Sequence, residues 1–115
     1  MKNETIEGNK LIAIFMGWIK SPYDNTLNKV YSKDLLEGKH LQYFCYDESW
    51  DELMPVVEKI ESLGFRVEII GLTCSIYTNS EENIYVDEPA MTKTEATWQS
   101  VVEFIKWYNS QTHNP

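Results

Sequence analysis

Cysteine, histidine and long apolar runs are scarce in this sequence, and each scarcity excludes a class of protein. The 115 residues include two cysteines and two histidines. No apolar run approaches the ~20 residues that a membrane-spanning helix needs, and the N-terminus lacks the pattern of a signal peptide. We therefore expect a cytoplasmic protein that does not bind a membrane. In that compartment Cys45 and Cys74 are expected to be reduced and buried.

Basic residues are also scarce. Ten Lys and Arg stand against 18 Asp and Glu, which gives a net charge of −8. The excess is concentrated in residues 47–95, where twelve acidic residues stand against three basic ones, a net charge of −9. Nucleic-acid backbones need a basic footprint, so we expect no nucleic-acid partner. The acids are expected to form solvated faces; the alternative is an acidic surface that mimics DNA and inhibits a DNA-acting enzyme.

Catalytic motifs are absent as well. The sequence has no Walker A run, no Gly-rich dinucleotide turn and no G-x-S-x-G. His40 precedes an expected strand and His113 lies in the C-terminal tail, and both are expected to be solvated. Cys45, Cys74 and His40 could supply three zinc ligands, but no closely spaced ligand pair is present. We therefore expect no metal, no cofactor and no enzymatic activity.

One acidic cluster keeps an enzymatic alternative open. Asp47, Glu48, Asp51 and Glu52 stand at the start of an expected helix. Four carboxylates at one junction could hold a divalent cation, and a small enzyme or metal-binding protein could use them. Their spacing matches no EF-hand loop, and two of them are also the acidic residues that a helix N-terminus favours.

The strongest local signals for secondary structure lie between Ser49 and Ile70. Ser49 with Glu52 three residues later makes a capping box, which predicts a helix beginning at Trp50. Gly64 is expected to end that helix in the left-handed conformation. The apolar side chains that fall on one face of the helix are Trp50, Leu53, Met54, Val56, Val57, Ile60 and Leu63.

After Gly64 the apolar period changes from 3.6 to 2, which predicts a strand over residues 65–70. Gly71-Leu72 is expected to form a two-residue turn with glycine at its first central position. That turn sets the register, with Ile69 opposite Cys74 and Val67 opposite Ile76 on one apolar face. The polar residues Arg66, Glu68, Ser75 and Tyr77 are expected to share the other face.

Three further elements complete the expected order. A first helix is predicted over residues 4–18, a strand over Leu41–Tyr46 and a last helix from the Thr92–Glu95 capping box to Asn109. A short edge strand is expected near Ile84. The fold class is α+β, a layered sandwich of order α-β-α-β-β-α. Its sheet has three to four mostly antiparallel strands. The helix between the first two main strands suggests either a parallel right-handed crossover or an arrangement with the third strand in the middle, and we favour the second.

Length predicts a single domain over residues 1–115, with residues 1–3 and 110–115 frayed. Turn residues such as Pro22 predict a long loop or a short helical turn in residues 20–40, the segment where partner-specific residues are expected. Residues 79–91 are expected to form an acidic loop.

Two runs of the sequence resemble a known family. They are Ser49-Trp50-Asp51 with Leu53–Glu61, and Val101–Asn109. They are similar to runs in small phage- and prophage-type proteins of gut bacteria, grouped as a phage ABA-sandwich domain family. The resemblance covers roughly residues 8–110 and rests on helical runs. It implies a layered α/β fold with helices on both sheet faces and a phage or mobile-element setting, and it implies no activity or site residues.

Aromatic residues supply the remaining candidate sites. Tyr43, Tyr46 and Trp50 concentrate at an expected loop-to-strand edge, where they could line a ligand groove or belong to the core. Phe104 and Trp107 lie on a second apolar side of the last helix, with Trp107 opposite Trp98. That side is either covered by another part of the chain or binds a partner or a second copy. The sequence thus favours a non-enzymatic protein-interaction module with an unknown protein partner.

Overall fold

The structure, a computed structural model, describes residues 3–19, 29–31, 38–78, 83–86 and 90–112. The chain divides into two compact units, Met1–Cys45 and Tyr46–Pro115, called unit 1 and unit 2 below. Most of the 20–40 segment, parts of the 79–91 loop and His113 lie outside the described residues. Among the described residues, no helix is both long and apolar enough to cross a membrane.

Unit 1 contains the first helix and a short ladder of two strands. Its elements are α1 (Asn3–Phe15), β1 (Lys29–Tyr31), β2 (Gly38–His40) and the 3-10 helix η1 (Leu41–Tyr43). The strands pair antiparallel, with Lys29 opposite His40. Helix α1 ends before Gly17, whose φ of 107° is the left-handed conformation expected of a terminating glycine. The sequence predicted this helix, but it did not predict the β1–β2 ladder.

Two contacts join Phe44, just after η1, to α1 and to the residues that follow α1. The buried Asn9 side chain donates from Nδ2 to the carbonyl oxygen of Phe44 at 2.9 Å. Trp18 packs edge-on against Phe44, with 5.2 Å between ring centroids. The amide hydrogen bond satisfies a polar group that would be costly to bury alone, so it fixes the register of η1 against α1.

The predicted strand Leu41–Tyr46 is wrong. Residues 41–43 form η1, and the Phe44 amide donates to the Leu41 carbonyl at 3.1 Å. Leu41 and Phe44 are both buried, whereas the Tyr43 side chain between them is 58% exposed. A buried pair three residues apart fits a helical turn and not a strand, in which alternate residues share a face.

Unit 2 begins with helix α2 (Trp50–Ser62). The Ser49 side chain accepts a hydrogen bond from the Glu52 amide at 3.3 Å, which confirms the predicted N-cap. At the other end Gly64 has a φ of 99°, and its amide donates to the Glu61 carbonyl at 3.0 Å. The buried residues of α2 are Leu53, Val56, Val57 and Ile60, all of them on the predicted apolar face.

A three-stranded antiparallel sheet follows, in the order β3-β4-β5. Its strands are β3 (Arg66–Ile70), β4 (Thr73–Tyr77) and β5 (Asn83–Ile84). The predicted register is confirmed, with Ile69 opposite Cys74 and Val67 opposite Ile76. Strand β5 pairs with the end of β4, where Ile84 lies opposite Ile76. The third predicted strand is therefore in the middle of the sheet, but its second neighbour is β5 and not residues 41–46.

Helix α3 (Lys93–Thr112) ends the chain's described part. The Glu95 amide donates to Thr92 Oγ1 at 3.0 Å, which confirms the second predicted cap. The helix runs three residues past the predicted end at Asn109, so residues 110–112 are helical and not frayed. Its buried residues are Ala96, Thr97, Ser100, Val101, Val102, Phe104 and Ile105.

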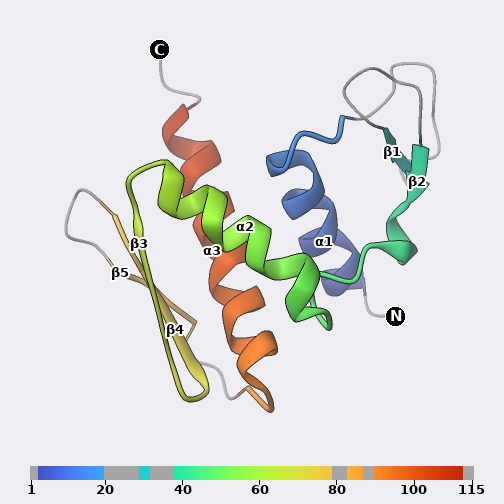
Figure 1. Cartoon of the computed structure of the whole chain (residues 1–115). Helices are drawn as coiled ribbons and strands as arrows, with labels where there is room; N and C mark the ends of the chain where they lie inside the picture. The colour runs from blue at the N-terminus through green and yellow to red at the C-terminus, as the bar shows by residue number, and fades with distance from the viewer. Residues whose placement is uncertain (1–2, 20–28, 32–37, 79–82, 87–89, 113–115) are drawn as a thin grey trace. The chain divides into compact units, whose positions relative to one another are not determined.

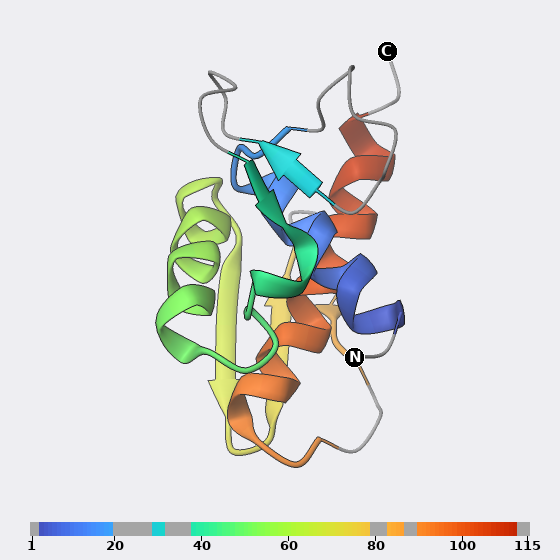
Figure 2. The same ribbon diagram turned by 90° about the vertical axis from the view of Figure 1, so that its right-hand side faces the viewer.

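In unit 2 both helices lie on the same face of the sheet (Figures 1 and 2). Helix α3 packs against β4 and β5, and α2 packs against β3 and α3. The apolar side chains Cys74 and Ile76 are buried under the helices, whereas the opposite face carries Arg66 and Tyr77. This is a small α+β arrangement, as predicted, and within unit 2 the described helices form one layer.

Candidate interaction surface

The tip of the β3–β4 hairpin exposes apolar side chains. Ile70 is 64% exposed and Leu72 is 53% exposed, although both are large aliphatic residues. Gly71 between them has a φ of 58°, which is the conformation that the first central position of a tight hairpin turn requires. Thr73 Oγ1 donates to the Ile70 carbonyl at 2.7 Å and braces the turn. The two aliphatic side chains therefore flank the glycine of a hydrogen-bonded turn and are exposed there.

A third exposed apolar residue stands at the same end of unit 2. Met91, just before α3, is 84% exposed. Helix α3 packs against β4, and the Ser100 hydroxyl in its first half donates to the Cys74 carbonyl at 2.6 Å. The β3–β4 turn and the chain leading into α3 lie at one end of unit 2 in both views (Figures 1 and 2). We call Ile70, Leu72 and Met91 the hairpin-tip surface.

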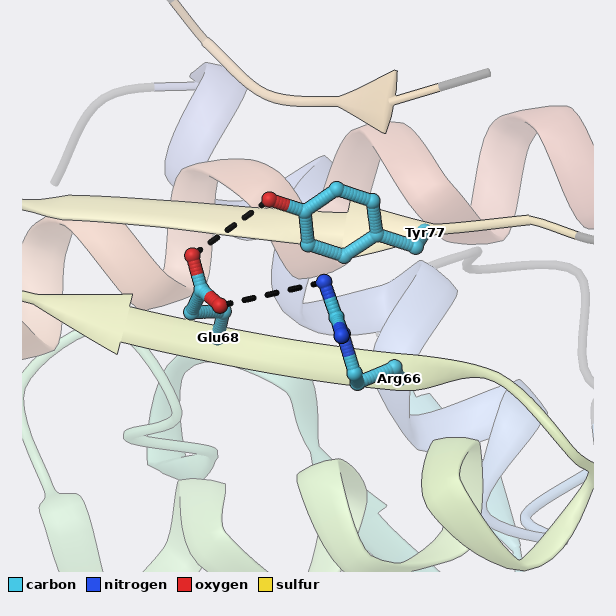
Figure 3. A network of polar contacts seen from close by, with 3 residues as sticks. All are labelled: Arg66, Glu68 and Tyr77. Atoms are coloured by element: carbon cyan, nitrogen blue, oxygen red, sulfur yellow. Dashed lines mark hydrogen bonds and ion pairs between the residues drawn. The ribbon is translucent and has the colours of Figure 1, made fainter. Parts of the chain in front are cut away.

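The outer face of the hairpin carries a polar network (Figure 3). The Tyr77 hydroxyl donates to Glu68 Oε1 at 3.3 Å, and Arg66 Nη2 lies 3.8 Å from Glu68 Oε2. The Arg66 guanidinium also covers the Tyr77 ring at 4.3 Å from its centroid. The Arg66 and Glu68 side chains are 69% and 42% exposed, so the ion pair contributes little stability. The face is charged and accessible.

Under the hairpin, Cys74 is a buried thiol. Burial raises the pKa of its thiol to about 11, and hydrogen bonds with the Ser100 and Thr97 side chains lower it by less. A thiol that stays protonated is a poor nucleophile and a poor metal ligand. Cys74 therefore has a packing role, and neither cysteine of the chain forms a disulfide.

The predicted ligand-groove residues occupy different environments. Tyr43 belongs to η1 in unit 1 and is exposed, whereas Tyr46 is buried at the start of unit 2. Burial, and secondarily the charge of Glu52, raises the pKa of the Tyr46 phenol to about 12. Trp50 is half-buried at the first position of α2. A ligand at these three residues stays a prediction.

The predicted partner-binding residues belong to an aromatic cluster. Phe65 packs edge-on against Phe104 and Trp107, with centroid separations of 5.0 and 5.9 Å. Tyr108 stacks on Phe104 at 5.7 Å. Phe104 is fully buried, so for this residue the structure supports the interpretation that another part of the chain covers it. Trp107 is half-buried, and contact of its exposed part with a partner stays a prediction.

The acidic cluster does not assemble in the described part of the chain. Asp51 and Glu52 occupy the first turn of α2, as expected, and Glu48 is exposed. No group of three or more His, Cys, Asp or Glu side chains that could hold a metal ion occurs among the described residues. The zinc ligand set of Cys45, Cys74 and His40 is therefore not assembled either.

Comparisons with protein-family models, with curated proteins and with solved structures find no match for this chain. The phage-type resemblance therefore stays a prediction.

Sequence reasoning missed the hairpin-tip surface. The sequence predicts the Gly71-Leu72 turn, which the structure confirms, but it does not predict the exposure of the aliphatic residues in and beside that turn. Turns are usually rich in Asn, Asp, Ser, Gly and Pro, whose side chains tolerate solvent. The run Ile69-Ile70-Gly71-Leu72 was therefore the available signal.

Proposed function

We propose that this chain is a non-enzymatic protein-interaction module and that the hairpin-tip surface is its contact. The observation that carries the proposal is the exposure of Ile70, Leu72 and Met91 at one end of unit 2. Exposing aliphatic side chains forgoes stabilisation of about 1.5–3 kcal/mol for each that could be buried. Large apolar side chains that are exposed at one end of a domain are candidates for a binding surface.

The charge of the chain suggests the chemistry of the partner. Residues 47–95 carry a net charge of −9, and they include the whole hairpin and the chain leading into α3. A segment with this charge favours association with a basic protein. The proposed partner therefore offers an apolar pocket for Ile70 and Leu72, surrounded by lysine or arginine residues.

The setting belongs to the proposal as well. The resemblance to small phage-type proteins supports a phage or mobile-element origin, in which a small acidic protein acts on another protein in the cytoplasm. The second candidate, an acidic inhibitor that mimics DNA, is favoured only by the concentration of carboxylates in residues 47–95. It differs from the first in the surface that contacts the partner.

The test compares two matched surface variants. Leu72 and Tyr85 are 53% and 58% exposed and both belong to unit 2, but only Leu72 lies at the hairpin tip. The partner is identified by affinity capture from the source organism with wild-type protein and mass spectrometry, then purified and titrated by calorimetry. We expect Leu72→Asp to weaken binding at least about tenfold, as for a buried apolar contact residue, and Tyr85→Asp to leave it unchanged.

Two results would contradict the proposal. If Leu72→Asp binds as tightly as wild type, the hairpin tip is not the contact. If a short DNA duplex displaces the protein from its partner while the Leu72 variant still binds, the DNA-mimic alternative replaces the proposal. Circular dichroism of both variants checks that each is folded.

A further inference from the structure

Strand β3 has one open edge. In the order β3-β4-β5 it pairs with β4 on one side only, and no strand among the described residues pairs with its other side. It is five residues long and carries no proline or bulge in its register. Strand edges of this kind are templates for pairing with a further strand.

The hairpin turn decides which backbone groups face that edge. In a hairpin with a two-residue turn, the pair next to the turn exchanges two backbone hydrogen bonds, and such pairs then alternate along the ladder. Here that pair is Ile70 with Thr73, so the next such pairs are formed by Glu68 and Arg66. Val67 and Ile69 therefore direct their N–H and C=O groups away from β4, toward the open edge.

The charges along this edge are self-complementary. When two copies of β3 run antiparallel with Val67 on the two-fold axis, Arg66 of each copy lies opposite Glu68 of the other. Both belong to pairs without backbone hydrogen bonds across the new interface, where opposed side chains approach most closely. Shifting the axis to Glu68 instead places two like charges opposite each other, which is unfavourable.

The Arg66 and Glu68 side chains can change from their ion pair within one strand to ion pairs across the two copies. The ion pair of Arg66 with Glu68 lies within one strand at 3.8 Å, between side chains that are 69% and 42% exposed, so breaking this ion pair costs little. The contacts of both residues with Tyr77 do not depend on that ion pair. Helices α2 and α3 lie on one face of the sheet (Figures 1 and 2), and Arg66, Glu68 and Tyr77 form the polar network shown in Figure 3. The same register places Phe65 opposite Ile69 and so extends the apolar face.

We propose that two copies of this chain associate through the β3 edge in this register, joining two three-stranded sheets into one of six strands. The occupant is a second copy because the charges of β3 complement themselves. The surface is separate from the hairpin-tip surface, so the inference does not depend on the proposed function.

The test is a charge exchange measured by sedimentation equilibrium on the full chain. Wild type is expected to show a concentration-dependent mass rising toward twice 13.5 kDa. Arg66→Glu and Glu68→Arg each place like charges in both cross-strand pairs, so each is expected to weaken self-association at least about tenfold. A mixture of the two variants restores both ion pairs and is expected to associate as a heterodimer. The double variant Arg66→Glu/Glu68→Arg is expected to self-associate like wild type.

The proposal is overturned if wild type stays monomeric up to about 200 µM. The dissociation constant would then exceed that concentration, and the association free energy would be weaker than about 5 kcal/mol. A dimer that Arg66→Glu leaves unchanged also overturns it, because the pairing would then use another surface or register. Thermal unfolding of each variant shows that the monomer is folded, so a loss of association cannot come from unfolding.

Discussion

Ser100 completes the hydrogen bonding of β4 at a point that β5 does not reach. The alternation of the ladder turns the Cys74 carbonyl away from β3, and β5 pairs only with Ile76 and Tyr77. The buried Ser100 hydroxyl takes the place of a strand partner at 2.6 Å. Ser100→Ala leaves this carbonyl unsatisfied, so we expect a loss of about 1–3 kcal/mol in the free energy of unfolding, measured with urea.

Ser110 provides the matched control for that change. Its hydroxyl also donates to a backbone carbonyl, that of Trp107 at 2.7 Å, but it is exposed. Water replaces the lost bond there, so Ser110→Ala is expected to change the free energy of unfolding by less than about 0.5 kcal/mol. Equal effects of the two substitutions would show that the Ser100 bond has no special role.

The buried thiol makes stability depend on alkaline pH. In the unfolded chain Cys74 ionises near its ordinary pKa of 9.0, whereas in the folded chain its pKa is about 11. Between these values the unfolded state binds fewer protons, so stability is full below pH 9 and falls as pH rises toward 11. The slope is at most about 1.4 kcal/mol per pH unit from this group.

The measurement compares urea unfolding of wild type and Cys74→Ala at pH 8, 9 and 10. Wild type is expected to be the more stable at pH 8, with the difference shrinking as pH rises, because only wild type loses the thiol contribution. The Tyr46 phenol, with its pKa of about 12, acts in the same direction but equally in both proteins. A difference that stays constant with pH contradicts the assignment.

At the scale of the elements, Gly64 and Gly71 both have a positive φ, but the two positions differ in which substitutions they tolerate. Gly64 after α2 has a φ of 99° and Gly71 in the hairpin a φ of 58°, and a Cβ at either position meets no atom within 4 Å. The backbone conformation alone therefore determines the cost of a substitution at these two positions. Asparagine accepts the left-handed region near 57° but not 99°. We expect Gly71→Asn to shift stability by less than about 0.5 kcal/mol and Gly64→Asn to cost about 1 kcal/mol or more.

Thermal unfolding of the two asparagine variants measures this difference, with Gly71→Ala as a reference because alanine lacks the local hydrogen bond that helps asparagine. Similar losses for Gly64→Asn and Gly71→Asn would mean that the conformations of the turns do not limit these positions.

Two aromatic residues of α3 belong to the same cluster but differ in burial. Phe104 is fully buried among Phe65, Trp107 and Tyr108, so Phe104→Ala is expected to cost about 3–5 kcal/mol. Trp107 is half-buried against Phe65, so Trp107→Ser is expected to cost about 2 kcal/mol and leave the protein folded. Urea titrations followed by circular dichroism give both values; a Trp107 variant that is unfolded in buffer contradicts the half-buried placement.

The sequence predicted those elements whose ends carry local signals. Ser49, Gly64, Gly71 and Thr92 each act within a few residues, and the structure places each as expected. The prediction of a strand over residues 41–46 failed because a short run that is apolar on both sides is typical of a buried strand, whereas burial follows the three-residue spacing of Leu41 and Phe44. The β1–β2 ladder failed because three-residue strands carry too short a pattern to recognise.

The candidate site could be predicted only in part, for a different reason. Pairing of the hairpin follows from its turn, so the outward positions of Arg66 and Glu68 were predictable. The exposure of Ile70 and Leu72 was not, because hydrophobicity alone favours burial and only the completed fold shows that no described element covers the tip. The burial of Phe104 was likewise not predictable, because it depends on contact with Phe65, which lies 39 residues away in the sequence.

At the scale of the whole molecule, uncompensated charge opposes folding. The net charge is −8, and residues 47–95 alone carry −9. Self-repulsion among these carboxylates falls when salt shortens the screening length from about 30 Å at 0.01 M to about 8 Å at 0.15 M. We therefore expect the free energy of unfolding to rise by about 1 kcal/mol between 0.01 and 0.15 M NaCl.

Urea titrations at the two salt concentrations check this, and Glu58→Gln/Glu61→Gln is the informative variant because both side chains are exposed on α2. It is expected to reduce the salt dependence without disturbing the core. A wild type whose stability falls with added salt would show that attractive ion pairs outweigh the repulsion.

The packing of Trp18 against Phe44 has a spectroscopic consequence. Trp18 is the only tryptophan of unit 1, whereas Trp50, Trp98 and Trp107 all belong to unit 2. Replacing the last three with phenylalanine leaves one fluorophore, held edge-on to a ring of its own unit at 5.2 Å. Its emission reports the unfolding of unit 1 alone, and circular dichroism at 222 nm reports the helices of both units. Coincident transitions would identify one cooperative folding unit, and separated transitions two.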